Sequence, residues 1–93
     1  MLLISQNREK LFDFEKVLLV EVIYSDRNWH LLAKLIDGND YHVGIFNSEE
    51  DAKKEIKNIY QAVWEGYRYH KISQLNKEGK PYSPTKEKED KLL

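Results

Sequence analysis

The sequence predicts an α+β fold: an antiparallel meander of four to five strands, one long C-terminal amphipathic helix packed on one face of the sheet, and then a flexible tail. Residues 2–46 contain apolar runs separated by turn-forming residues, as strands and hairpins require. Residues 49–71 carry apolar side chains at helical spacing. Beyond residue 75 apolar residues become scarce, so we expect a single domain over residues 1–75 and a flexible charged tail over residues 76–93.

The composition excludes several classes of protein and of site. Lys and Arg total 15 and Asp and Glu total 16, so the net charge of -1 gives no general attraction to nucleic acid or to anionic membranes. The absence of cysteine excludes disulfides, thiolate metal ligands and a cysteine nucleophile. The longest apolar run, residues 17–20, is far too short to cross a bilayer, and residues 1–6 lack the basic start of a signal peptide. We therefore expect a cytoplasmic protein with no membrane partner.

The expected strands are the apolar runs at residues 2–4, 11–14, 17–24, 29–36 and 41–46. The last three are separated by turn-forming residues at 25–28 and 37–39. Because side chains alternate between the two faces of a strand, the lengths of these loops determine which residues share a face. A four-residue first loop and a three-residue second loop give a face that is entirely apolar or aromatic. We expect this to be the core face: Leu18, Val20, Val22, Tyr24, Trp29, Leu31, Ala33, Leu35, Tyr41, Val43 and Ile45.

The opposite face of the predicted sheet is too apolar to be covered only by water. It contains Glu21, Lys34 and two histidines, yet most of its other positions are aliphatic or aromatic. We expect part of it to bind a partner protein or a second copy of the chain in a homodimer. The alternative is that the tail or the first strands of the same chain cover it. The residues of this expected surface are Leu19, Ile23, Leu32, Ile36 and Phe46.

The expected helix begins after Ser48, because this hydroxyl can cap the first turn and the acids at 49–51 suit the positive end of the helix dipole. Gly66 disfavours helix and is interpreted as a bend. Trp64 and Tyr69 are expected to be exposed. The stripe expected to pack on the sheet is Ala52, Ile56, Ile59, Tyr60, Val63, Tyr67 and His70. The residues expected to face away from the sheet are Lys54, Glu55, Asn58, Gln61, Glu65 and Arg68.

Three local motifs occur in a distinctive order along the chain. They are Ile-Ser-Gln at 4–6, Phe-Asp-Phe at 12–14, and Gly-Ile-Phe-Asn-Ser-Glu-Glu-Asp-Ala-Lys at 44–53. In this order the chain resembles small uncharacterised proteins of phages and prophages of Gram-positive bacteria, over residues 2–60. The motifs are strands and a helix entry, so the resemblance implies a fold, a phage or mobile-element origin and a bacterial host cell. It transfers no catalytic residue.

The sequence contains no convincing metal-binding or catalytic motif. His30, His42 and His70 lack a recognised ligand spacing, and no cysteine supports them. Neither a Gly-x-Ser-x-Gly nucleophile nor a glycine-rich phosphate loop occurs. Glu21, an acid in the middle of a strand, is interpreted as the edge of a partner surface rather than as a catalytic acid. We expect no metal, no cofactor, no small-molecule substrate and no enzymatic activity.

These observations favour a non-catalytic protein-interaction module. It would be a phage or mobile-element accessory protein that binds and occludes a host or phage protein, counter-defence inhibitors being one subclass. The expected binding residues are those of the sheet surface together with Trp64, Arg68 and Tyr69, because Trp, Tyr and Arg often anchor interfaces. The alternative is a nucleic-acid-binding accessory protein that uses the aromatic and basic end of the helix: Trp64, Tyr67, Arg68 and Lys71.

Overall fold

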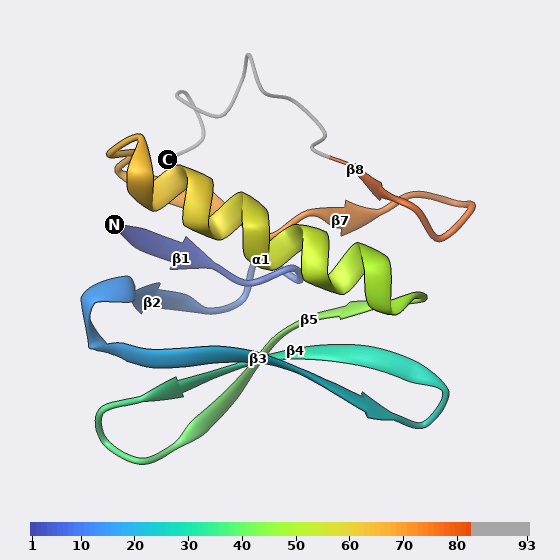
Figure 1. Ribbon diagram of the computed structural model, residues 1–93, viewed down its shortest axis with the longest axis horizontal. Helices are drawn as coiled ribbons and strands as arrows, with labels where there is room; N and C mark the ends of the chain where they lie inside the picture. Colours follow the sequence, from blue (N-terminus) through green and yellow to red (C-terminus); the bar gives the residue numbers. More distant parts are fainter. Residues whose placement is uncertain (83–93) are drawn as a thin grey trace.

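The computed structural model describes residues 1–82 and is α+β, with eight strands in three small sheets and a single helix in the middle of the chain (Figure 1). Its elements are β1 (Leu2–Ile4), β2 (Leu11–Asp13), the 3-10 helix η1 (Phe14–Lys16), β3 (Val17–Ser25), β4 (Asn28–Leu35), β5 (Asp40–Phe46), α1 (Glu49–Trp64), β6 (Tyr69–Lys71), β7 (Gln74–Leu75) and β8 (Pro81–Tyr82). One sheet has the strand order β2-β1-β6, the second has the order β3-β4-β5, and β7 pairs with β8.

The chain is α+β, but the predicted architecture of one meander with a C-terminal helix is wrong. Strands β1 and β2 do not extend the β3-β4-β5 meander, because they form a separate sheet with β6. β6 follows the helix and pairs parallel with β1, so that Leu3 lies opposite His70. The helix is therefore central in the chain, and residues after it complete a sheet that begins at the N-terminus.

The helix ends earlier than predicted because Gly66 terminates it. Ser48 caps the start as expected, since its Oγ accepts the backbone N–H of Asp51 at 3.1 Å. At the other end Gly66 has φ +75°, a left-handed conformation that favours glycine. The N–H of Tyr67 donates to the carbonyl of Ala62 at 3.0 Å, and the N–H of Gly66 donates to that of Val63 at 3.1 Å. These two bonds form a Schellman cap, so Gly66 is a helix stop and not a bend.

The β3-β4 hairpin follows the predicted register over most of its length. Tyr24 lies opposite Trp29, as predicted, and the ladder continues inside the turn with the pair Ser25 and Asn28. The turn itself is therefore the two-residue loop Asp26-Arg27, with φ of 51° and 65°. A bulge at residue 18 then shifts the ladder, so Val17 rather than Leu18 lies opposite Leu35. Leu18 was predicted to be in the core, but it is 63% exposed.

The β4-β5 pairing differs from the prediction, and this reverses the role of Phe46. Ala33 lies opposite Tyr41 rather than Val43, and a second irregularity occurs between Leu31 and Leu32. As a result Phe46 pairs with Trp29 on the core side of the sheet, where it is fully buried. The prediction that Phe46 belongs to an outward binding surface is therefore wrong. A bulge adds one residue to one strand only, which transfers the following side chains to the other face.

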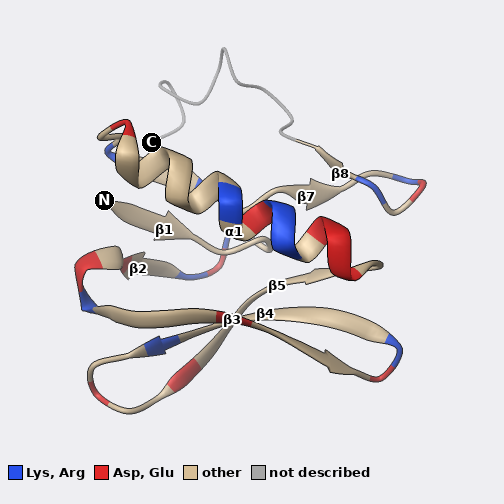
Figure 2. Cartoon of the chain, viewed as in Figure 1, with Lys and Arg blue, Asp and Glu red and all other residues tan. Residues whose placement is uncertain are grey.

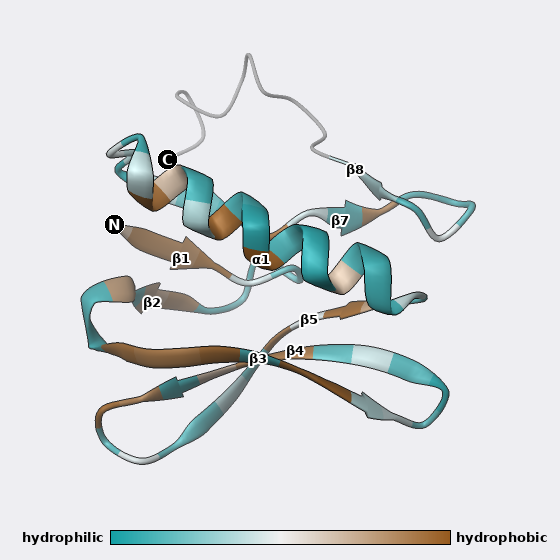
Figure 3. Cartoon of the chain, in the orientation of Figure 1, coloured by the Kyte–Doolittle hydropathy of each residue, from teal (hydrophilic) through white to brown (hydrophobic). Residues whose placement is uncertain are grey.

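The core lies between α1 and the two three-stranded sheets (Figure 1). The helix contacts β3, β4, β5 and β6. Figure 3 shows apolar segments along β1, β2 and the first part of β3, and a mostly hydrophilic outer side of the helix. Sheet and helix residues together form the buried cluster: Leu3, Phe12, Leu31, Ala33, Val43, Phe46, Ala52, Ile59 and Ile72.

The buried face of α1 is not the predicted stripe. Its buried residues are Ala52, Glu55, Ile59 and Ala62. Glu55 was predicted to face away from the sheet, but only 1% of it is exposed. Tyr60 and Val63 were predicted to be in the core, but they are 63% and 46% exposed. The helix is therefore rotated about its axis relative to the prediction, with two small alanines on its packed side.

Gln6 links the two larger sheets and closes the outer edge of β5. Its backbone N–H donates to the carbonyl of Val43 at 2.8 Å. Its carboxamide donates to the carbonyls of Ile45 and Ser73, each at 2.9 Å, and accepts the N–H of Ile45 at 2.9 Å. The side chain thus pairs with Ile45 as a neighbouring strand would.

The short sheet of β7 and β8 crosses the expected boundary between the domain and the tail. Leu75 lies opposite Pro81, and the turn between them is joined to the rest of the fold by Asn47, whose Nδ2 donates to the Gly79 carbonyl at 3.1 Å. The remainder of the expected tail, residues 83–93, lies outside the described residues.

Candidate functional site

The outer face of the β3-β4-β5 sheet contains three of the predicted binding residues. Leu19 and Ile23 are 43% and 39% exposed, and Leu32 beside them is partly buried. Ile36 is 62% exposed, but it lies in the turn after β4 rather than within the sheet. The irregularity in the β4-β5 pairing removes Phe46 from this face.

Two histidines occupy the same outer face and hydrogen-bond each other. His30 Nδ1 lies 2.9 Å from His42 Nε2, and His30 Nε2 lies 3.0 Å from the carbonyl of Ser25. A carbonyl only accepts, so His30 carries its proton on Nε2, and His42 donates to its Nδ1. Burial lowers the pKa of His42, and the charges of His30 and Lys10 lower it further. One proton thus links His30 Nδ1 and His42 Nε2. Within residues 1–82, no group of three or more His, Cys, Asp or Glu side chains is placed to hold a metal ion.

The C-terminal end of α1 exposes a cluster of large side chains, called here the helix-end cluster: Tyr60, Val63, Trp64 and Tyr67. Trp64 is 76% exposed, the most of any large hydrophobic side chain within residues 1–82. Its ring stacks on that of Tyr60, with centroids 6.4 Å apart and an interplanar angle of 24°. Tyr67 follows the Gly66 cap and is 54% exposed.

The structure confirms only part of what the sequence predicted for this region. Trp64 and Arg68 are exposed, whereas Tyr69 is half-buried because it belongs to β6. Tyr60 was predicted to lie in the core stripe. Tyr67 was placed in the same stripe, although the nucleic-acid alternative used it as a surface residue. The available signal was the spacing of Ala52, Ile59 and Ala62, because positions i, i+7 and i+10 lie on one side of a helix.

A buried carboxylate attaches β6 to the helix. Glu55 Oε2 lies 2.8 Å from His70 Nε2, and Ser73 hydrogen-bonds the same carboxylate through its side chain and its backbone. Burial raises the pKa of Glu55, but the hydrogen bonds from His70 and Ser73 outweigh it, so the pKa lies below its ordinary value. Sequence reasoning missed this pair because a glutamate on a helix is usually exposed.

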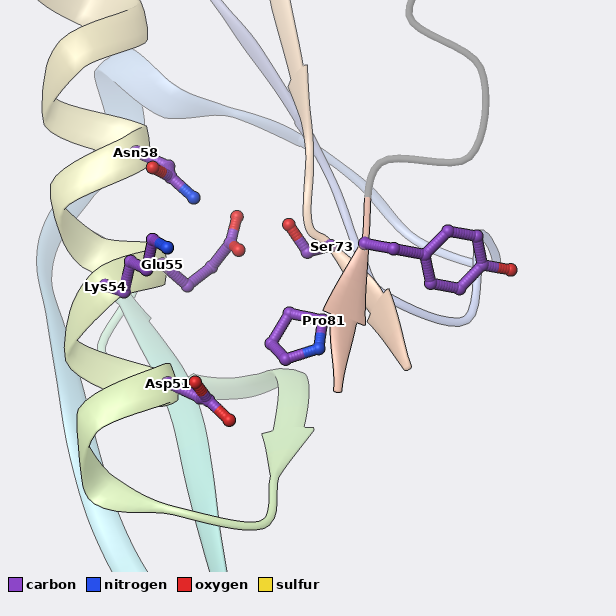
Figure 4. Close-up of a pocket in the computed structure, with 7 residues that line it drawn as sticks. Asp51, Lys54, Glu55, Asn58, Ser73 and Pro81 are labelled. Atoms are coloured by element: carbon purple, nitrogen blue, oxygen red, sulfur yellow. The ribbon is translucent and has the colours of Figure 1, made fainter. Parts of the chain in front are cut away.

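A shallow pocket of about 240 Å³ lies beside this pair, between α1 on one side and Ser73 and β8 on the other. Figure 4 shows Glu55 directed toward Ser73 and Pro81. Asp51 also lines the pocket, and its buried Oδ2 has no hydrogen-bond partner among the described residues. Among the described residues, His70 and Ser73 both hydrogen-bond the Glu55 carboxylate, so the Ser73 hydroxyl is not paired with the imidazole, which is the usual base for a serine nucleophile.

Comparison of the chain with protein-family models, with curated proteins and with solved structures gave no match. Within residues 1–82, no helix has the length and apolar character that crossing a bilayer requires.

Proposed function

We propose that this chain is a non-catalytic protein-interaction module that binds a partner protein through the helix-end cluster. The observation that carries the proposal is the exposure of Trp64, which is 76%, beside Tyr60 and Tyr67. Exposed apolar surface of this kind often marks an interaction site. Trp and Tyr are also the side chains most enriched among residues that dominate binding energy.

The arrangement of the cluster favours a partner with an apolar groove. Tyr60, Val63 and Trp64 are spaced at i, i+3 and i+4, so they share one side of α1. Helices that bind in grooves use anchors at this spacing. Figure 2 shows that the charged residues of α1 lie in its N-terminal half, and residues 58–64 carry none. The C-terminal half can therefore be buried against a partner without desolvating a charge on the helix.

The bonding of the buried polar groups beside α1 favours a binding role over a catalytic one. Glu55 and His70 are bonded to each other, and Ser73 is bonded to the same carboxylate, so these groups serve packing. We propose a host or phage protein as the partner class, following the phage or mobile-element origin expected from the sequence motifs of residues 2–60. Binding would act by occluding a surface of that protein.

Nucleic acid remains the rival ligand for the same region, because Arg68 and Lys71 lie next to the cluster in sequence. Glu65 lies between Trp64 and Arg68 in sequence and opposes a phosphate backbone there. Lys71 Nζ lies over the Tyr69 ring at 5.9 Å from its centroid, which engages this cation within the fold. These observations favour protein over nucleic acid.

The test has two stages. Tagged wild-type chain, Trp64→Ala and the control Leu11→Ala, which shortens another exposed side chain, are used to capture proteins from a nuclease-treated lysate of a Gram-positive host. A protein retained by wild type and Leu11→Ala but lost with Trp64→Ala is then purified and titrated by calorimetry. We expect Trp64→Ala to weaken its binding at least about 30-fold, with little change between low and high salt. Salt-sensitive binding of oligonucleotides that also requires Trp64 would instead establish the nucleic-acid alternative.

A further inference from the structure

Strand β3 exposes apolar side chains on both of its faces. Leu19 and Ile23 are on the outer face of the sheet, whereas Tyr24 is on the inner face and is 57% exposed. Leu18, at the bulge, is 63% exposed. If the sheet merely lacked a helix or a second sheet packed against it, only one face of the strand would expose apolar side chains. Exposure on both faces arises because β3 is at the edge of its sheet, and no strand within residues 1–82 pairs with its outer side.

The two edges of the β3-β4-β5 sheet differ. Gln6 occupies the edge of β5 by pairing with the backbone N–H and C=O of Ile45. In an antiparallel ladder, two residues directly opposite each other point their backbone N–H and C=O groups either toward each other or away from each other. The groups of Ile45 point away from β4, so those of His30 point away from β5 and toward Ile23 on β3. The direction of the backbone groups alternates from one residue to the next along a strand. Because those of Ile23 point toward β4, the N–H and C=O groups of Val20, Val22 and Tyr24 point away from the sheet, toward its open edge. Within residues 1–82, no backbone hydrogen bond outside the ladder reaches these three residues.

We propose that two copies of the chain associate through antiparallel pairing of their β3 strands, which joins the two three-stranded sheets into one. Open edge strands of this length are templates for strand addition. The pairing uses a surface separate from the helix-end cluster, so it stands or fails independently of the proposed function. It also joins the outer faces of the two sheets into one larger apolar surface.

The charge of Glu21 selects the register. Pairing centred on Glu21 would place the two glutamates directly opposite each other, which is destabilising. Pairing centred on Val22 places Val22 opposite Val22, Val20 opposite Tyr24, and Glu21 opposite Ile23. The outward backbone groups of these residues then form about six hydrogen bonds between the copies. Apolar side chains meet apolar side chains along the inner side, so a second copy is a suitable partner for this strand.

The first experiment uses the absence of cysteine from the chain, which makes any introduced thiol unique. In the proposed register the two Cα atoms of residue 22 are about 5.5 Å apart, within the range that a disulfide spans. We expect Val22→Cys to form a covalent dimer on mild oxidation. Ser25→Cys is the matched control, because its two copies would be about 20 Å apart and should crosslink at least about 10-fold more slowly. Equal crosslinking rates for the two variants would overturn the register and with it the proposal.

The second experiment measures the association of the full chain by analytical ultracentrifugation over a range of concentrations. Val22→Pro removes a backbone N–H that faces the open edge of β3, and it breaks no hydrogen bond between β3 and β4. It should therefore weaken dimerisation at least about 10-fold while the circular dichroism spectrum stays that of the native fold. Trp64→Ala should leave dimerisation unchanged. A wild-type chain that remains monomeric at about 1 mM, or a dimer that needs Trp64 and tolerates Val22→Pro, would overturn the proposal.

Discussion

Replacing Glu55 with alanine is expected to lower the free energy of unfolding by about 3 kcal/mol at pH 7. The carboxylate is 1% exposed and accepts hydrogen bonds from His70, at 2.8 Å, and from Ser73. A hydrogen bond to a charged group contributes about 1.5 kcal/mol or more, so losing the bonds from the His70 ring and the Ser73 hydroxyl alone gives this estimate. Urea unfolding followed by circular dichroism measures the change. The control is Lys57→Ala, an exposed position on the same helix, which should change stability by less than about 0.5 kcal/mol.

The pH dependence of the same pair gives an independent check. Hydrogen bonds from His70 and Ser73, which outweigh burial, keep the pKa of Glu55 below its ordinary 4.5. The unfolded chain therefore binds the proton more readily than the folded chain, and the stability from Glu55 is present above pH 4.5 and is lost as the pH falls through the folded pKa. The difference in unfolding free energy between wild type and Glu55→Gln should thus be largest near pH 7 and shrink below pH 4.5. A difference that is constant with pH, or an alanine variant as stable as Lys57→Ala, would refute the reasoning.

Three further changes test other parts of the structure. Gly66→Ala should destabilise the fold by about 1 kcal/mol in thermal unfolding, because φ is +75° while the space around the missing Cβ is empty; no loss would mean that the helix is not capped there. Gln6→Ala removes three side-chain hydrogen bonds and should reduce stability by about 3 kcal/mol in urea, against less than about 0.5 kcal/mol for Asn47→Ala. Since burial and the charges of His30 and Lys10 lower the pKa of His42, wild type should lose stability relative to His42→Asn as the pH falls below 6.5, and parallel pH profiles would contradict the pairing with His30.

The turn-forming residues between two apolar runs predicted the β3-β4 hairpin, and the assumed loop length gave its register. Tyr24 lies opposite Trp29 as expected. No local pattern marks the bulge at residue 18, whereas Gly44 inside the β5 run was an available signal for the irregularity opposite Leu31 and Leu32, because an isolated glycine in a strand often marks a bulge. One inserted residue was enough to transfer Phe46 from the outer face to the core.

The helix and β6 show a different limit. Ser48 predicted the start of α1, but Gly66 is compatible with either a bend or a stop, and only the following strand decides between them. β6 has three residues and pairs with β1 across more than 60 positions of sequence, so no local periodicity could reveal it. Glu55 was assigned to the surface because its burial depends on His70, which β6 supplies.

The candidate site was predicted in part for the same reasons. Trp64 and Arg68 are exposed as expected, since neither fits the apolar stripe. Tyr60 and Tyr67 were misplaced because an aromatic residue near a stripe is equally compatible with core and surface until the partner sheet is known.

The central claim is that the helix-end cluster binds a partner protein, and site-specific photocrosslinking tests it most directly. The photoreactive residue p-benzoylphenylalanine replaces Trp64 in one chain and Leu11, the exposed control, in another, and both are irradiated in a Gram-positive host lysate. The account predicts one dominant protein adduct from position 64 that excess wild-type chain displaces and that position 11 does not form. Equal adducts from both positions, or none from position 64, would contradict it.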